Sequence, residues 1–148
     1  MKIEHITLAI DKYYDNNHQT MCGIWAYITS GKYNEEKLYR YFKKIQHRGP
    51  DRSDFGEMSE INKMLTMFIG FHRLAIVDKT VAGDQPFKYY RDGKTIYSFC
   101  NGEIYNYKEV KKVFSKYSYV SRSDCEVLMP IFKKEGIEGI VKRVDAEY

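Results

Sequence analysis

From Cys22 onward, short strand-like runs alternate with amphipathic helical segments, and this interleaving constrains the fold more than any other feature. The strand-like runs are apolar and rich in β-formers, whereas the helical segments carry an apolar stripe. Because the two kinds of segment do not follow the regular spacing of βαβ units, the pattern predicts an α+β fold. The expected strands are residues 22–29, two runs within 64–78 that separate near Gly70, and 94–100 after the turn Asp92-Gly93.

The helical segments are bounded by caps and breakers. The expected helices are residues 34–50, 107–117, 123–136 and 137–144. Asn34 caps the first helix and Gly49-Pro50 ends it. The third begins at a Ser/Asp cap and ends at Gly136, and Pro130 inside it is expected to kink it. The buried stripes are expected at Leu38, Tyr41, Phe42 and Ile45 in the first helix and at Val110, Val113, Phe114 and Tyr117 in the second.

Residues 1–21 differ in character from the chain that follows. Residues 3–11 alternate weakly and predict a short strand with Ile6, Leu8 and Ile10 on one face. Residues 12–20 are polar and indicate a loop. We therefore expect residues 1–21 to be an extension, or the product of a start assigned too far upstream, and residues 22–148 to form the domain.

Composition excludes several classes of protein. The net charge of +4 comes from lysines scattered along helical segments, which solvated helix faces explain, and no nucleic-acid-binding motif is present. Three cysteines without a CxxC pair argue against a disulfide framework or a structural zinc site. No run approaches 18 apolar residues, so the sequence predicts no membrane partner and a cytoplasmic location.

Cys22 follows Met21 and precedes Gly23, an arrangement that looks like the start of a protein. A cysteine thiolate is a nucleophile for acyl transfer and needs a proton acceptor. The pKa of a free α-amino group is ~7.7–8.0 and that of a thiol ~8.5, so an N-terminal cysteine contains its own base, acting through a water. Gly23 would let a substrate approach the backbone closely. On these residues alone, a buried structural cysteine remains the alternative.

Six motifs follow in chain order: MCGIWA, QHRGPDRSD, GFHRLAIVD, QPF, NGEIYNY and SDCEVL. Together they resemble the glutaminase domain of glutamine-dependent asparagine synthetases, which are class II glutamine amidotransferases with an N-terminal nucleophile. The resemblance implies a four-layer αββα sandwich of the N-terminal nucleophile hydrolase type. It also implies that this fold is incomplete at the C-terminus, because that domain continues past the position of Tyr148 for several strands.

The resemblance assigns roles at both ends of a bound glutamine. Arg73 matches the residue that binds the α-carboxylate, for which a guanidinium fork is well suited. Asp124 and Glu103 match the positions expected at the α-ammonium group. Residues that would wall the pocket are Leu74, Ile76 and Val77. Taken alone, Asp124 could be only a helix N-cap, and Arg73 could form a surface pair with Asp78.

The remaining motif residues concern the reacting carboxamide. The Asn101 side-chain amide and the Gly102 backbone N–H match the family's oxyanion hole, although alone they could form only a tight turn. His72 is interpreted as a structural strand residue. The segment from His47 to Asp51 (HRGPD) is interpreted as a supporting shell near the active site, with a helix stop as its simplest explanation.

The implied activity is hydrolysis of glutamine to glutamate and ammonia, which supplies nitrogen for ATP-dependent asparagine synthesis from aspartate. No SGG or Walker-type loop occurs in this chain, so the synthetase half is missing and its ATP and Mg with it. This half-reaction needs no cofactor or metal, and a separate synthetase chain would have to supply the rest. The alternative is an inactive remnant, or a regulatory module that binds glutamine or a synthetase without turnover.

Overall fold

A computed structural model describes residues 22–62 and 65–147. The strand expected at residues 3–11 lies outside the described residues. The described chain divides into two compact units, the first ending at Leu74 and the second beginning at Ala75. Every described strand pairing is antiparallel, and helices accompany the strands in both units, so the α+β prediction is confirmed.

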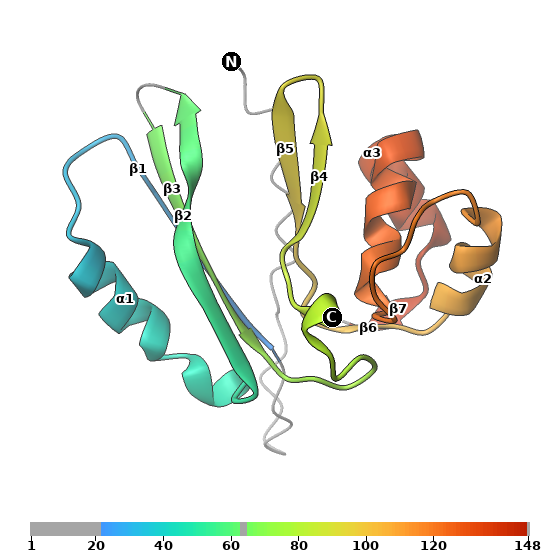
Figure 1. The fold of residues 1–148 in the computed structure, drawn as a ribbon, viewed down its shortest axis with the longest axis horizontal. Coiled ribbons are helices and arrows are strands. Elements are labelled where there is room, and N and C mark those ends of the chain that lie inside the picture. Colours follow the sequence, from blue (N-terminus) through green and yellow to red (C-terminus); the bar gives the residue numbers. More distant parts are fainter. Residues whose placement is uncertain (1–21, 63–64, 148) are drawn as a thin grey trace. The chain divides into compact units, whose positions relative to one another are not determined.

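The first unit is built on an antiparallel sheet with the strand order β1-β3-β2 (Figure 1). Its strands are β1 (Gly23–Thr29), β2 (Arg52–Asn62) and β3 (Leu65–Arg73). The prediction of a strand at residues 22–29 is confirmed to within one residue. Strand β2 was not expected, because its exposed residues from Arg52 to Asp54 lack the apolar run by which a strand is usually identified.

Strand β3 passes through Gly70 without a break, so the predicted separation into two runs is wrong. Gly70 pairs with Trp25 on one side and with Phe55 on the other, in an uninterrupted register. A Cβ at this position would lie 2.4 Å from the ring of Phe42. The glycine therefore makes room for a packed ring and does not end the strand.

Helix α1 (Glu35–Lys43) lies along one side of this sheet (Figure 1). As predicted, Asn34 caps it, and its Oδ1 accepts a hydrogen bond from the Lys37 N–H at 2.8 Å. Leu38 and Phe42 are buried, but Tyr41 is 45% exposed and does not belong to the stripe. Consecutive helical residues point about 100° apart, and the contact with the sheet is narrow enough to leave Tyr41 outside it.

The second unit contains a hairpin of β4 (Phe87–Arg91) and β5 (Lys94–Ser98). Its turn is formed by Asp92 and Gly93, whose φ angles of 51° and 74° are the positive values that a two-residue hairpin turn requires. The predicted strand after this turn is confirmed, although it ends at Ser98. The two-residue strands β6 (Glu103–Ile104) and β7 (Ala146–Glu147) form a separate pair.

Two helices complete the second unit: α2 (Tyr107–Val113) and α3 (Leu128–Arg143). Helix α2 is shorter than predicted, and its last residue, Val113, is 59% exposed and does not belong to the buried stripe. Pro130 does not kink α3, because it lies in the first turn, where its missing N–H has no helical partner to lose. The break falls at Gly136, whose φ of 68° ends the first helical segment as predicted.

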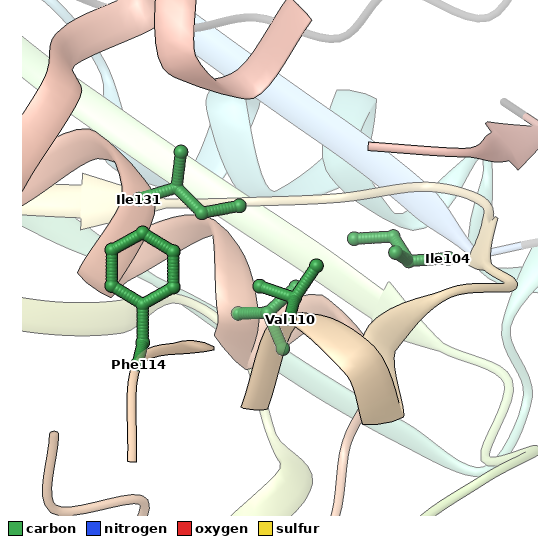
Figure 2. Packing of buried hydrophobic residues seen from close by; sticks show 5 residues of the cluster. Ile104, Val110, Phe114 and Ile131 are labelled. Carbon is green, nitrogen blue, oxygen red and sulfur yellow. The ribbon is translucent and has the colours of Figure 1, made fainter. Parts of the chain in front are cut away.

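The core of the second unit consists of two apolar clusters. One joins α2 to α3 and β6, and Figure 2 shows its packing. Its buried members are Ile104, Val110, Phe114, Val127 and Ile131. The other joins the start of the hairpin and the residues that follow it to the beginning of α3. Its buried members are Phe87, Cys100, Cys125 and Met129. These clusters fix the ends of the segments that carry Asn101 and Asp124.

Candidate active site

Cys22 lies immediately before β1, and its thiol contacts the residue that follows β3. The Leu74 N–H donates a hydrogen bond to the Cys22 Sγ at 3.2 Å, and the Sγ lies 3.5 Å from the Leu74 carbonyl. Strand pairing explains this proximity, because Gly23 faces His72 in the antiparallel register. The half-buried thiol is therefore held at the edge of the sheet by main-chain groups of a predicted pocket residue.

The segment from His47 to Asp51 packs around the same place. The Arg48 Nε donates to the Cys22 carbonyl at 3.4 Å, and the Asp51 N–H donates to the Arg73 carbonyl at 3.0 Å. Gly49 is so close to β3 that a Cβ would lie 2.2 Å from the His72 carbonyl. This segment, which overlaps a 3₁₀ helix at Gln46–Arg48, thus contacts the main chain at both Cys22 and Arg73.

His72 is completely buried and has two hydrogen-bond partners. Its Nε2 lies 3.0 Å from the Phe42 carbonyl, which can only accept, so the Nδ1 is left to accept from the Ser53 hydroxyl at 2.7 Å. Its ring stacks on that of Phe42, with centroids 3.8 Å apart. Burial lowers the pKa of His72. These features fit a neutral, structural imidazole, in agreement with the interpretation from the sequence.

Arg73 is the last residue of β3 and is 5% exposed. It directly precedes Leu74, so the predicted carboxylate-binding residue and the main chain beside the Cys22 thiol are neighbours in sequence. Asp78, named with Arg73 in the alternative of a surface pair, is also only 5% exposed. Cys22, Arg73 and Leu74 all belong to the first unit.

The other predicted site residues belong to the second unit. Asn101 is 5% exposed and follows β5 closely. Among the described glycines, positive φ angles occur at Gly93 and Gly136, so Asn101-Gly102 is not a turn of the kind that needs a left-handed glycine. A type I turn, which needs no positive φ, is still compatible with these two residues.

Asp124 is 6% exposed and is bound to β6. Its Oδ2 accepts a hydrogen bond from the Ile104 N–H at 2.8 Å, and it makes no side-chain cap to the following 3₁₀ helix at Cys125–Val127. The N-cap alternative is therefore not what the structure shows. Because Glu103 directly precedes Ile104, this contact brings the segments of both predicted ammonium-binding carboxylates together.

Ile76 and Val77 are 55% and 42% exposed, and the chain beside them is held by Asp78. The Asp78 Oδ1 accepts from the Thr80 N–H and hydroxyl, each at 2.8 Å. Its Oδ2 accepts from the Arg122 N–H, also at 2.8 Å. This buried carboxylate thus ties the segment of two predicted wall residues to the loop that leads to Asp124.

Glu126 is a third buried carboxylate, and the sequence motifs predicted no role for it. Its two oxygens accept hydrogen bonds from the N–H groups of Val120 and Ser121, both at 2.8 Å, and from the Ser121 hydroxyl at 2.6 Å. Burial and this carboxylate raise the pKa of the nearby Tyr119 to about 12. The available signal was a charged residue inside the otherwise apolar run CEVLM, but its partners could not be inferred from that run.

Comparison with known proteins identifies the family to which this antiparallel α+β chain belongs. The chain belongs to the family of glutamine amidotransferase domains, whose family model matches residues 21–148. Its relatives are named as glutamine-hydrolysing asparagine synthetases, so the resemblance seen in the motifs is confirmed.

Three relatives show the extent of the similarity. A probable asparagine synthetase of Acanthamoeba polyphaga mimivirus is 42% identical over 130 residues, or 86% of this chain and 22% of that protein. The enzyme of Asparagus officinalis is 33% identical over 131 residues (86% and 20%), and asparagine synthetase 3 of Arabidopsis thaliana is 33% identical over 121 residues (80% and 19%). The chain thus spans about a fifth of the length of these relatives.

Two structural features are absent from the described part of the chain. No helix there is both long and apolar enough to cross a membrane. Nor do three or more His, Cys, Asp or Glu side chains gather anywhere in residues 22–62 and 65–147 in a way that could hold a metal ion.

Proposed function

We propose that this chain hydrolyses glutamine to glutamate and ammonia, with Cys22 as an N-terminal nucleophile. Membership of the glutamine amidotransferase domain family supports the substrate. The observation that carries the proposal is the hydrogen bond from the Leu74 N–H to the Cys22 Sγ, because it holds the one half-buried thiol among the three cysteines beside a predicted pocket residue.

The proposed reaction has two stages. The thiol proton of Cys22 passes to its own α-amino group through a water, and the Sγ attacks the carboxamide carbon. The oxyanion so formed is stabilised by the Asn101 side-chain amide and the Gly102 N–H. The carbon–nitrogen bond then breaks, and ammonia leaves with the proton that the α-ammonium group returns. Water adds to the thioester and releases glutamate, which restores the thiol.

The α-amino group must be free for this chemistry, because an amide nitrogen is not basic at neutral pH. We therefore propose that the active chain begins at Cys22. Initiation at Met21 followed by removal of that methionine would produce this N-terminus, and so would proteolysis. A chain that keeps residues 1–21 would bind glutamine without turning it over, which is the second candidate function.

The substrate roles follow the residue-by-residue resemblance. Arg73 binds the α-carboxylate, Asp124 and Glu103 bind the α-ammonium group, and Leu74, Ile76 and Val77 wall the pocket. We further propose that the domain has the four-layer αββα arrangement of N-terminal nucleophile hydrolases. Ammonia would be used in the cytoplasm by a synthetase that makes asparagine from aspartate. Both ATP and Mg would belong to that synthetase, and this chain would use no cofactor.

An ammonia-release assay with glutamine tests the proposal. Wild-type protein should release ammonia, Cys22→Ala should release none above background, and Cys22→Ser should fall between them or near background, because a hydroxyl is a weaker nucleophile. Equal release by wild type and Cys22→Ala would refute the proposed function. Glutamine binding without release by wild-type protein would favour the second candidate.

A further inference from the structure

Gln85, in the QPF motif, has no assigned role, yet its buried side chain binds the main chain of the residue before Asn101. We propose that Gln85 is a positioning residue that orients the oxyanion-stabilising groups of Asn101 and Gly102 through the backbone of Cys100. This inference rests on the proposed function, since it concerns the same oxyanion.

The Gln85 amide makes two hydrogen bonds to one residue. Its Oε1 accepts from the Cys100 N–H at 2.6 Å, and its Nε2 donates to the Cys100 carbonyl at 3.1 Å. Gln85 is 6% exposed and Cys100 4% exposed, so water is a poor substitute for either bond. An amide side chain can satisfy both main-chain groups at once because it carries one acceptor and two donors.

The position of Gln85 in the hairpin explains this pairing. The β4–β5 ladder ends where Phe87 faces Ser98, and the contact between the Gln85 side chain and Cys100 lies just beyond that end. Pro86 lies between and has no N–H to continue the ladder. The side chain of Gln85 therefore supplies the hydrogen bonds that the strand backbone would otherwise make, and it extends the order of the ladder to the residue before Asn101.

Two contacts bracket the peptide unit that carries the proposed oxyanion donor. The Gly102 N–H belongs to the peptide between Asn101 and Gly102. The carbonyl of the preceding peptide, that of Cys100, is held by Gln85. The carbonyl of the following peptide, that of Gly102, faces the Cys125 Sγ at 3.7 Å. The two contacts hold the peptides on either side of the donor peptide, and so they fix the positions of the Asn101 and Gly102 Cα atoms between which it lies.

Preorganised donors of this kind lower the free energy of the transition state more than that of the bound ground state. Loss of an oxyanion donor typically lowers kcat by ~10²–10³, and a misplacement of about 1 Å can cost ~10²-fold. Binding of the α-carboxylate and α-ammonium groups does not involve Gln85. A positioning role therefore predicts a lower kcat with little change in KM. A merely structural role predicts loss of folded protein, without a change in kcat that exceeds the change in KM.

The test compares Gln85→Ala, Gln85→Glu and, as a matched control, Ile131→Ala, which empties a buried position in the other apolar cluster. We expect Gln85→Ala to lower kcat at least about 10-fold with less than about 2-fold change in KM. The aldehyde analogue of glutamine forms an adduct with the thiol, a hemithioacetal whose tetrahedral carbon carries an oxygen like that of the intermediate. Gln85→Ala should weaken binding of this analogue by a similar factor and leave glutamate affinity unchanged. Ile131→Ala should lower the melting temperature but spare the kcat of the folded protein.

Gln85→Glu provides a pH readout. A protonated carboxyl group both accepts and donates, as an amide does, whereas a carboxylate cannot donate to the Cys100 carbonyl. The ratio of kcat for Gln85→Glu to that of wild type should therefore rise as the pH falls from about 8 to about 6. A ratio independent of pH, or equal losses in kcat and glutamate affinity, would overturn the positioning role.

Hydrogen exchange tests the contact between Gln85 and Cys100 independently of the proposed glutaminase activity. In substrate-free protein, Gln85→Ala should speed exchange of the Cys100 N–H at least about 10-fold, because its buried partner is gone. Unchanged exchange at Cys100 would overturn the inference whatever the activity. Faster exchange at Cys100, in a wild-type protein that releases no ammonia, would uphold the backbone contact while the proposed function fails.

Discussion

Asp78 and Arg122 lie 44 residues apart in the sequence, yet the Asp78 carboxylate accepts a hydrogen bond from the Arg122 N–H at 2.8 Å. The same carboxylate binds the N–H and hydroxyl of Thr80. One buried side chain therefore organises two loops of the second unit, and one of these loops leads to Asp124. The geometry of the proposed ammonium site depends on such contacts as much as on the residues that would touch glutamine.

Asp78→Asn should destabilise the second unit by about 1–3 kcal/mol, because the new NH₂ group would face a backbone N–H and leave a buried donor without its acceptor. Urea unfolding measures this change, and faster hydrogen exchange at Arg122 would locate it. Asp145→Asn, at an exposed carboxylate of the same unit, is the control and should have an effect below about 0.5 kcal/mol. Equal stabilities of the two variants would contradict the role given to Asp78.

Gly70→Ala should destabilise the protein by about 1–3 kcal/mol, since its Cβ would lie 2.4 Å from the Phe42 ring in a packed core. Gly56→Ala is a matched control in β2, because nothing lies within 4 Å of a Cβ there. That substitution should be neutral or stabilising by about 0.4–1 kcal/mol. If denaturant unfolding shows both variants to be alike, the packing of Phe42 against Gly70 is not as described.

His72 makes the stability of the first unit depend on pH. Its pKa is lowered by burial, so the unfolded chain binds a proton more readily than the folded one. The contribution of neutral His72 to the free energy of unfolding should therefore be fully present above the unfolded pKa of about 6.5. It should decrease as the pH falls from there through the folded pKa. His72→Gln removes this titration, and the loss of unfolding free energy between about pH 7.5 and 5.5 should be smaller in that variant. An equal loss in both proteins would assign the acid sensitivity elsewhere.

Arg73→Ala should weaken glutamine binding by ~1.5–3 kcal/mol, the range for hydrogen bonds to charged groups. Arg73→Lys keeps the charge but not the planar fork, so its loss should be smaller. Arg40→Ala, which removes an exposed guanidinium of the same unit, should leave the affinity unchanged. Calorimetry that finds wild-type affinity in Arg73→Ala would refute the assignment of the α-carboxylate.

Features set by neighbours in sequence were predictable. The Asn34 cap, the Asp92-Gly93 turn and the break at Gly136 each depend on the backbone preference or hydrogen bonding of a few adjacent residues. Gly70 was misread because the ring that fills its space comes from a distant helix. The exposure of Tyr41 likewise depends on the width of the contact between α1 and the sheet, which the stripe pattern does not contain.

The motifs predict residues of the candidate site, but they do not contain the contacts that support those residues. Cys22, Arg73 and Asn101 are predicted because each residue type fits one chemical requirement of glutamine hydrolysis. The contact between Cys22 and Leu74 depends on the register of two strands, and that between Gln85 and Cys100 on where a ladder ends. Such relationships follow from strand pairing across the fold, and local sequence patterns do not determine them.

The most direct test of the account measures the N-terminus and the activity of the same preparation. Protein expressed from the full chain would be analysed by intact mass and N-terminal sequencing, and its ammonia release from glutamine would be divided by the fraction of chains that begin at Cys22. The account predicts a constant value per chain that begins at Cys22 and none for chains that keep residues 1–21. Undiminished release by chains that retain Met1 would contradict it, and so would chains that all begin at Cys22 but release no more ammonia than Cys22→Ala.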